Sequence, residues 1–196
     1  MRSNTYTVVK VGGSLYQLPD LRDRLRAFLT TLPAGSVLLV PGGGAAADAI
    51  RALDRIHQLG EETSHWLAIQ ALSLNAAFLQ SLLPEAHLVE GRENSANFFA
   101  PKLAILDALP FFRADEARPD HLPHRWEVTS DSLAVRAAVL CEARELILLK
   151  STDGSGADWA TTNQPGVVDA YFAEAVAQVP RGLSVRVVNL RSQPIR

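Results

Sequence analysis

The sequence predicts an α/β fold, a three-layer αβα sandwich around a central, mostly parallel sheet. Apolar, strand-like runs alternate along the chain with stretches of helical periodicity, which is typical of helices covering both sides of a parallel sheet. The 196 residues, of which 47% are hydrophobic, suffice to bury a substantial core. No internal repeat or low-complexity segment divides the chain, so we predict a single domain over residues 1–196.

The first half of the chain predicts six elements. Short apolar runs indicate strands, and apolar residues three or four positions apart indicate helices. In order they are a strand over residues 5–11, a helix over 20–32, a strand in SVLLVPGGG, a helix over 45–58, an uncharged helix over 64–83 and a short strand in AHLVE.

The second half is less regular. Between residues 91 and 127 the pattern predicts no helix or strand, and we expect the polar stretch RADEARPDHLPHRWE (residues 113–127, the flap) to lie on the surface. Thr129 or Ser130 suits the N-cap of the helix that follows. The remaining elements are this helix over 131–141, a buried strand in RELILLKS, a turn in TDGSG, an amphipathic helix in VVDAYFAEAVAQV and a strand in LSVRVVNL.

Composition excludes several classes of protein. With 19 basic and 21 acidic residues, the chain lacks the basic excess of a nucleic-acid-binding protein. Its single cysteine, Cys141, excludes an internal disulfide framework and the usual multi-cysteine zinc sites, and we expect it to be buried in the core. The uncharged segment 66–83 carries five serine or amide side chains, too many for a membrane span. We therefore expect a soluble, cytoplasmic protein that forms a homo-oligomer through helix 64–83.

Three strand ends carry residues suited to an anion. Lys10 stands in an apolar strand that ends at Val11, just before Gly12 and Gly13. The second strand ends in Gly42 to Gly44, and Lys150 at the end of a third is followed by the turn at Asp153. Ligands of open α/β sheets bind at the carboxyl ends of strands, where glycines let backbone amides approach an anion. We predict a site for more than one phosphate, the alternative being plain strand–helix turns. The phosphate-binding motifs G-x-x-x-x-G-K-[ST] and G-x-G-x-x-G after a strand are both absent.

As a set, four motifs resemble the amino acid kinase family. They come in the family's order: KVGGS at residues 10–14, PGGG at 41–44, TSDSLA at 129–134 and LLKSTDG at 148–154. The resemblance implies an αβα sandwich and an ATP-dependent small-molecule kinase in which Mg²⁺ bridges the ATP phosphates. The stretches GGGAAADAIRALD, SHWLAIQAL, LPHRWEVTSDSLA and VVDAYFAEAV are similar to those of short archaeal-type members. This similarity implies a phosphate monoester as acceptor, an aminomethyl-furan-methyl phosphate of methanofuran-type cofactor biosynthesis in one-carbon metabolism.

The resemblance also implies roles for individual residues. Lys10 would bridge the transferred phosphoryl group, Asp131 would orient the lysines, and Lys150 would lie on the ATP side, which makes these three the catalytic residues. The implied nucleotide and phosphoryl contacts are Gly12, Gly13, Ser14, Ser151, Thr152, Asp153 and Gly154. The implied acceptor contacts are Gly42, Gly43, Gly44, Thr129 and Ser130.

Other residues have two interpretations each. Asp48 could pair with an acceptor amine and Arg51 with an acceptor phosphate, or the two could form an ordinary exposed i, i+3 pair. Trp126 could stack on a ring-shaped acceptor or belong to the core. His121 and His124, three apart and without nearby cysteines, are weak evidence for a metal site, so we predict surface residues and no resident metal.

One feature departs from the family pattern. Many members carry a second lysine in a glycine-rich stretch after the D-G turn, whereas residues 155–179 contain no lysine. Lys150 could supply that charge, or an arginine such as Arg92 or Arg125 could approach from the weakly patterned region 91–127. Two alternatives stay open: a kinase for another acceptor (isopentenyl phosphate, a nucleoside monophosphate or a carboxylate), and a non-catalytic protein that binds a nucleotide or oxyanion.

Overall fold

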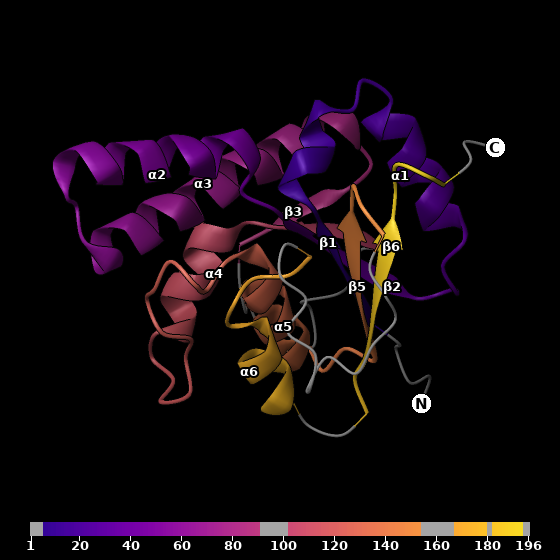
Figure 1. Ribbon diagram of the computed structural model, residues 1–196. Helices are drawn as coiled ribbons and strands as arrows, with labels where there is room; N and C mark the ends of the chain where they lie inside the picture. Colours follow the sequence, from indigo (N-terminus) through magenta and orange to yellow (C-terminus); the bar gives the residue numbers. More distant parts are fainter. Residues whose placement is uncertain (1–5, 91–101, 154–166, 180–181, 194–196) are drawn as a thin grey trace.

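The computed structural model describes residues 6–90, 102–153, 167–179 and 182–193 (Figure 1). Its strands form one six-stranded parallel sheet in the order β3-β4-β2-β1-β5-β6. The strands are β1 (Tyr6–Val11), β2 (Ser36–Pro41), β3 (His87–Val89), β4 (Leu103–Leu106), β5 (Glu145–Lys150) and β6 (Ser184–Asn189). The helices are η1, a 3₁₀ turn (Gly13–Gln17), α1 (Leu21–Thr30), α2 (Gly44–His57), α3 (Glu61–Leu82), α4 (Ala108–Asp115), α5 (Ser130–Leu140) and α6 (Phe172–Ala177).

Helices cover both faces of the sheet, which confirms the predicted αβα sandwich. In Figure 1, α1, α2 and α3 lie above the sheet and α4, α5 and α6 below it. Side chains alternate between the faces along each strand. In β1, Val8 therefore joins the apolar cluster around α4, α5 and α6, whereas Val9 joins the cluster around α1. The long helix α3 contributes to both clusters, through Leu72 to the first and Leu79 to the second.

The same alternation decides where the two strand-end lysines point. Lys10 is two residues after Val8, and Lys150 is two residues after Leu148, and both of these apolar residues lie in the cluster that contains α5. Both lysines therefore extend on the α5 side of the sheet, at the carboxyl ends of neighbouring strands.

Two elements lie where the sequence predicted none. β4 and α4 fall within residues 91–127, and β4 is only four residues long. It pairs with β2 on one side and β3 on the other and is almost fully buried, so its stability comes from tertiary pairing rather than from a strong local pattern. The predicted helix in VVDAYFAEAVAQV is shortened to α6.

Two other expectations have structural outcomes. Cys141 is buried and directly follows α5, in agreement with its expected core position. In the part of the chain that the structure describes, no helix is both long and apolar enough to cross a membrane.

Candidate active site

Two lysines share one buried carboxylate at the ends of β1 and β5. Lys10 Nζ lies 2.8 Å from Asp131 Oδ1, and Lys150 Nζ lies 2.8 and 2.7 Å from the two Asp131 oxygens. Asp131 stands in the first turn of α5, where the positive end of the helix favours a carboxylate. Because two ammonium groups face one carboxylate, the cluster keeps a net positive charge and suits an anionic ligand.

Burial and charge shift two of these groups. Burial alone would raise the pKa of Asp131, but the charges and hydrogen bonds of Lys10 and Lys150 outweigh it and hold the pKa below its ordinary value. Burial, together with the nearby charge of Lys10, lowers the pKa of Lys150 to about 8 against the opposing effect of Asp131. Asp131 is therefore ionised at neutral pH, whereas Lys150 is held close to the point at which it loses its proton.

The two glycine loops touch backbone to backbone. A Cβ on Gly13 would lie 2.2 Å from the backbone nitrogen of Gly44, so no larger residue fits without moving the loops apart. Gly44 also has a left-handed φ of +52°, which glycine adopts without strain. The Gly12 amide donates to the Leu149 carbonyl oxygen at 2.9 Å. The implied contact from that amide to a phosphate is therefore not supported, because the amide extends the strand ladder.

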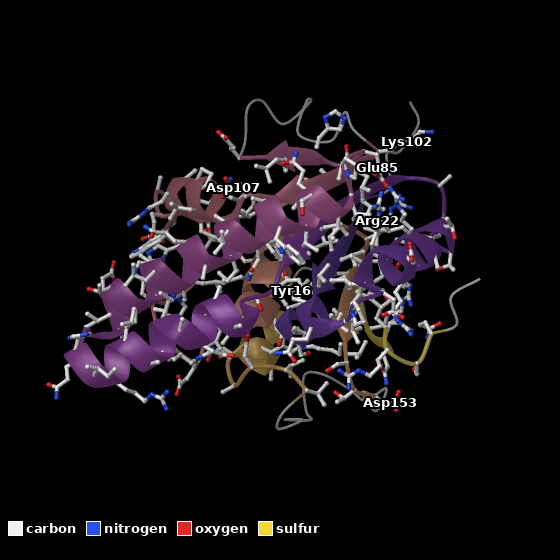
Figure 2. The ribbon with its side chains drawn as sticks, turned by 90° about the horizontal axis from the view of Figure 1, so that it is seen from above. Tyr16, Arg22, Glu85, Lys102, Asp107 and Asp153 are labelled. Carbon is white, nitrogen blue, oxygen red and sulfur yellow. The ribbon has the colours of Figure 1, made fainter. Side chains whose placement is uncertain are left out.

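Two residues that the sequence did not identify hold the triple-glycine loop. Asn75, on α3, donates from Nδ2 to the carbonyl oxygens of Gly42 and Gly43, both at 2.7 Å. The Tyr16 hydroxyl donates to the Gly42 carbonyl oxygen at 3.1 Å and accepts from the Gly42 amide at 2.8 Å. Figure 2 shows Tyr16 near the middle of the molecule, and burial raises its pKa, which keeps the phenol protonated. Gly42 is therefore a structural residue, held from two sides.

Asp169 fixes the start of α5. Its carboxylate accepts hydrogen bonds from the amide and hydroxyl of Thr129, at 3.1 and 2.7 Å, and from the amide and hydroxyl of Ser132, at 3.0 and 2.5 Å. Thr129 is the N-cap residue, as predicted, but a carboxylate distant in sequence supplies the capping oxygens. Asp131 lies within this first turn, so Asp169 positions the carboxylate that pairs with the lysines.

We expect Asp169→Ala to lower the free energy of unfolding by about 2 kcal/mol, because the first turn of α5 loses its capping carboxylate. Urea unfolding of the variant and the wild type measures the difference. Glu90→Ala, which removes an exposed carboxylate, serves as the matched control and should leave stability unchanged. Equal unfolding midpoints for Asp169→Ala and the wild type would contradict the capping role.

A pocket of about 180 Å³ opens beside the glycine loops. This volume is many times the space needed by one water, so a small molecule fits. Its lining consists of the two glycine loops, one face of α2 and α3, the end of the flap and the start of α5. The lining residues are Gly13, Ser14, Gly43, Gly44, Ala47, Arg51, His65, Ala68, Ile69, Leu72, Arg125, Trp126, Val128, Thr129, Ser130 and Leu133. Two arginines and no carboxylate are among these described residues, so the pocket favours an anion.

The structure brings most of the predicted acceptor residues to this pocket. Asp48 and Gly42 are the exceptions, since neither is among the lining residues. Asp48 is 70% exposed in its side chain and pairs with Arg51 at 2.7 Å. The Arg51 guanidinium also lies 5.3 Å from the centre of the Trp126 ring, and the Trp126 indole donates to Asp54 at 2.8 Å. Trp126 thus attaches the flap to α2 and presents a half-buried ring to the pocket.

The predicted nucleotide residues are divided: Gly13 and Ser14 line the pocket, whereas Ser151 to Asp153 directly follow β5. The hydroxyls of Ser14 and Ser151 are 2.9 Å apart and join the loops after β1 and β5. Asp153, labelled at the edge of the molecule in Figure 2, accepts a hydrogen bond from Asn189 at 3.0 Å. Thr152 is exposed beside it. Gly154 and Arg92 lie outside the described residues.

Comparisons with known proteins agree with this geometry. The chain is 27% identical over 153 residues to the [5-(aminomethyl)furan-3-yl]methyl phosphate kinase of Methanocaldococcus jannaschii, a match that covers 75% of this chain and 66%, just under two thirds, of that relative. Among solved structures, the UMP kinase of Ureaplasma parvum superposes with a TM-score of 0.63 at 14% identity, covering 96% of this chain and 91% of that one. The uridylate kinase of Archaeoglobus fulgidus gives a TM-score of 0.55 at 19% identity, covering 83% and 70%. These two likenesses show a shared fold.

The family itself follows from a broader match. The amino acid kinase family model matches residues 5–154, which include all four motifs and the Lys10–Asp131–Lys150 cluster. This match covers most of the chain, and the chain belongs to the amino acid kinase family.

Proposed function

We propose that the protein is an ATP-dependent phosphotransferase that moves the γ-phosphoryl group of ATP to a phosphate monoester. The observation that carries this proposal is the Lys10–Asp131–Lys150 cluster, which stands at the strand ends next to a cationic pocket. The kinase names of its relatives support it. A cytoplasmic location and a role in one-carbon metabolism belong to the same proposal.

The site suits phosphoryl transfer because this reaction needs positioning and positive charge more than covalent chemistry. Lys10 would neutralise an equatorial oxygen of the γ-phosphoryl group as a phosphate oxygen of the acceptor attacks phosphorus and ADP leaves. A phosphate monoester is largely deprotonated at pH 7, so the attack needs no general base. Asp131 is consistent with this, since both of its oxygens already accept from lysines and would orient them.

Mg²⁺ fits this site as a companion of the nucleotide. The one buried carboxylate of the cluster, Asp131, is occupied by two ammonium groups, so the ion would be held mainly by the ATP phosphates, a common arrangement for Mg²⁺. When bound, it would supply further positive charge to the phosphates.

The pocket supports an acceptor that combines a phosphate with a small ring. Arg51 and Arg125 would bind the phosphate, and Trp126 would contact the ring above the apolar residues Ile69 and Leu72. An aminomethyl-furan-methyl phosphate, named in the relative from Methanocaldococcus jannaschii, has these parts. Asp48 pairs with Arg51 and does not line the pocket, so the amine of this acceptor has no carboxylate partner among the described lining residues.

An ADP-release assay tests this proposal directly. ATP and Mg²⁺ are incubated with the protein and, in turn, the furan phosphate, isopentenyl phosphate, UMP, a carboxylate or no acceptor. We expect acceptor-dependent ADP with the furan phosphate. ADP with another acceptor alone would correct the substrate, and no acceptor-dependent ADP at all would favour the binding-protein alternative.

The charge of Lys150 should determine how kcat/KM for ATP depends on pH. Lys150 is protonated below its pKa of about 8 and neutral above it, so kcat/KM for ATP should fall as the pH rises through about 8. Lys150→Arg keeps its charge at all accessible pH values, and this fall should be absent from its profile. A fall of the same size and midpoint in an active Lys150→Arg variant would contradict the assignment to Lys150.

We also propose a homo-oligomer that forms through residues 64–83. Leu74 and Phe78 on α3 are 65% and 39% exposed, which suits a surface covered by a second copy. Leu74→Glu should lower the mass measured by light scattering, whereas Ile56→Glu on α2, also exposed, should leave it unchanged. A wild type that is monomeric, or a Leu74→Glu variant of unchanged mass, would rule out this interface.

A further inference from the structure

Histidines and carboxylates converge where the flap meets the first turns of α3. His124, 14% exposed in its side chain, lies between Glu62, 2.5 Å from Nδ1, and Glu116, 3.0 Å from Nε2. His121 Nδ1 is 3.7 Å from the same Glu116 oxygen, and the His65 ring stacks on His124 with centres 4.6 Å apart. None of these residues belongs to the Lys10–Asp131–Lys150 cluster.

We propose that Glu116, His121 and His124 bind a divalent transition-metal ion, for which Zn²⁺ is the best candidate. One ligand atom from each residue can be chosen so that all three lie within 4.8 Å of one another. Tetrahedral zinc, with bonds of about 2.0–2.1 Å, places its ligand atoms about 3.3 Å apart. The separations of 3.0 and 3.7 Å from the Glu116 oxygen bracket this value. Two imidazoles and a carboxylate are a zinc ligand set that leaves the fourth position for water.

The surroundings of His124 favour a metal ligand over an isolated surface histidine. Glu62 faces Nδ1 and Glu116 faces Nε2. With a metal ion bound at Nε2, the proton of the ring would be on Nδ1 and would be donated to Glu62. Glu62 is itself oriented, since the Trp66 indole donates to its other oxygen at 2.8 Å. Carboxylate–histidine–metal arrangements of this kind are usual around bound zinc. The sequence analysis considered the two flap histidines alone, and their proximity to Glu116 and Glu62 comes from the structure.

Magnesium fits these residues poorly. It prefers oxygen ligands in octahedral geometry, whereas two of the three ligands here are imidazoles. Any metal ion bound at His121 Nδ1 would replace the 3.0 Å contact of this nitrogen with the carbonyl oxygen of Leu122. The proposed ion is therefore distinct from any Mg²⁺ that accompanies ATP.

The proposed metal has a structural consequence for the pocket. All three ligands come from the flap, which also presents Arg125 and Trp126 to the pocket. Glu62 links the same cluster to α3. A bound ion would therefore hold the flap over the pocket, so we expect it to lower the KM for the acceptor and to leave the KM for ATP unchanged.

Zinc binding can be measured without any assumption about catalysis. The full chain, freed of metal and without ATP, is titrated with Zn²⁺ in competition with a chromophoric chelator. We expect one equivalent of tightly bound zinc, at least tenfold weaker binding in His121→Ala, and a 10–100-fold loss in Glu62→Gln, which removes the charge that faces His124. Millimolar Mg²⁺ should not displace the zinc. His87→Ala removes an exposed histidine on β3 and should bind zinc as the wild type does.

Two results would overturn the proposal. The first is the absence of a stoichiometric zinc site, and the second is a His121→Ala variant that binds as tightly as the wild type. Either result means that the cluster is a hydrogen-bonded network only. Co²⁺ gives a second readout, since a tetrahedral site produces intense visible absorption that His121→Ala should abolish. Because His121 is exposed, the variant should keep the fold, which circular dichroism verifies.

Discussion

Replacing Lys10 with alanine is expected to lower the turnover of the proposed reaction about a thousandfold. An ammonium about 4 Å from a unit charge contributes about 4 kcal/mol at an effective dielectric of about 20, and the full effect on the transition state corresponds to about a thousandfold in rate. The fold should survive, because Lys150 keeps its bidentate contact with Asp131 after Lys10 is removed. Steady-state ADP release at saturating ATP and acceptor measures the loss.

The matched control for Lys10 is Lys102. This lysine is exposed just before β4 and lies at the edge of the molecule in Figure 2, on a segment apart from the cluster. Lys102→Ala should turn over as the wild type does. Undiminished turnover in Lys10→Ala would refute the proposed role of the cluster even if the protein proved to be a kinase.

Asp131→Asn is expected to produce the largest loss of stability. The substitution leaves two neighbouring, buried ammonium groups without their shared carboxylate, and breaking a buried ion pair from one side costs about 3–5 kcal/mol. Urea unfolding at pH 7 should show this difference from the wild type. Turnover should fall as well, because the lysines lose the group that orients them.

The sign of the pH effect on this variant follows from Lys150. A lysine whose pKa in the folded state, about 8, lies below its unfolded value of about 10.4 destabilises the fold at low pH, because the unfolded chain binds the proton more tightly. Asp131 opposes this shift by favouring the protonated lysine, so Asp131→Asn lowers the folded pKa of Lys150 further and enlarges the destabilisation. This added destabilisation is present while Lys150 is protonated in the wild type, and it is lost as the pH rises through about 8. The stability gap between Asp131→Asn and the wild type should therefore shrink from pH 7 to pH 9.5. A gap that stays constant or widens would contradict the electrostatic explanation.

The core of the candidate site could be predicted from the sequence because each of its parts is local. Lys150 ends an apolar strand and Lys10 is the penultimate residue of another, and the alternation along a strand places both on one face. Asp131 falls in the first turn of a helix with a recognisable start. The proximity of the two lysines follows from the rule that the carboxyl ends of parallel strands lie at one edge of the sheet.

The parts that the sequence could not predict depend on contacts between distant segments. Asn75 holds the triple-glycine loop from α3, and Asp169 caps α5 from 40 residues away in the chain. In each case a single polar residue in an ordinary stretch carries no local pattern. β4 was missed for a related reason, since four apolar residues form a strand there only because β2 and β3 flank them.

Transfer of labelled phosphate tests the central claim most directly. ATP labelled in its γ-phosphoryl group is incubated with Mg²⁺, the furan phosphate and either the wild type or Lys10→Ala, and the products are separated. We expect the label in a new phosphoanhydride of the acceptor with the wild type, formed about a thousandfold more slowly by the variant. Label that stays in ATP, or appears as inorganic phosphate whether or not acceptor is present, would contradict a phosphoryl-transfer site built on Lys10, Asp131 and Lys150.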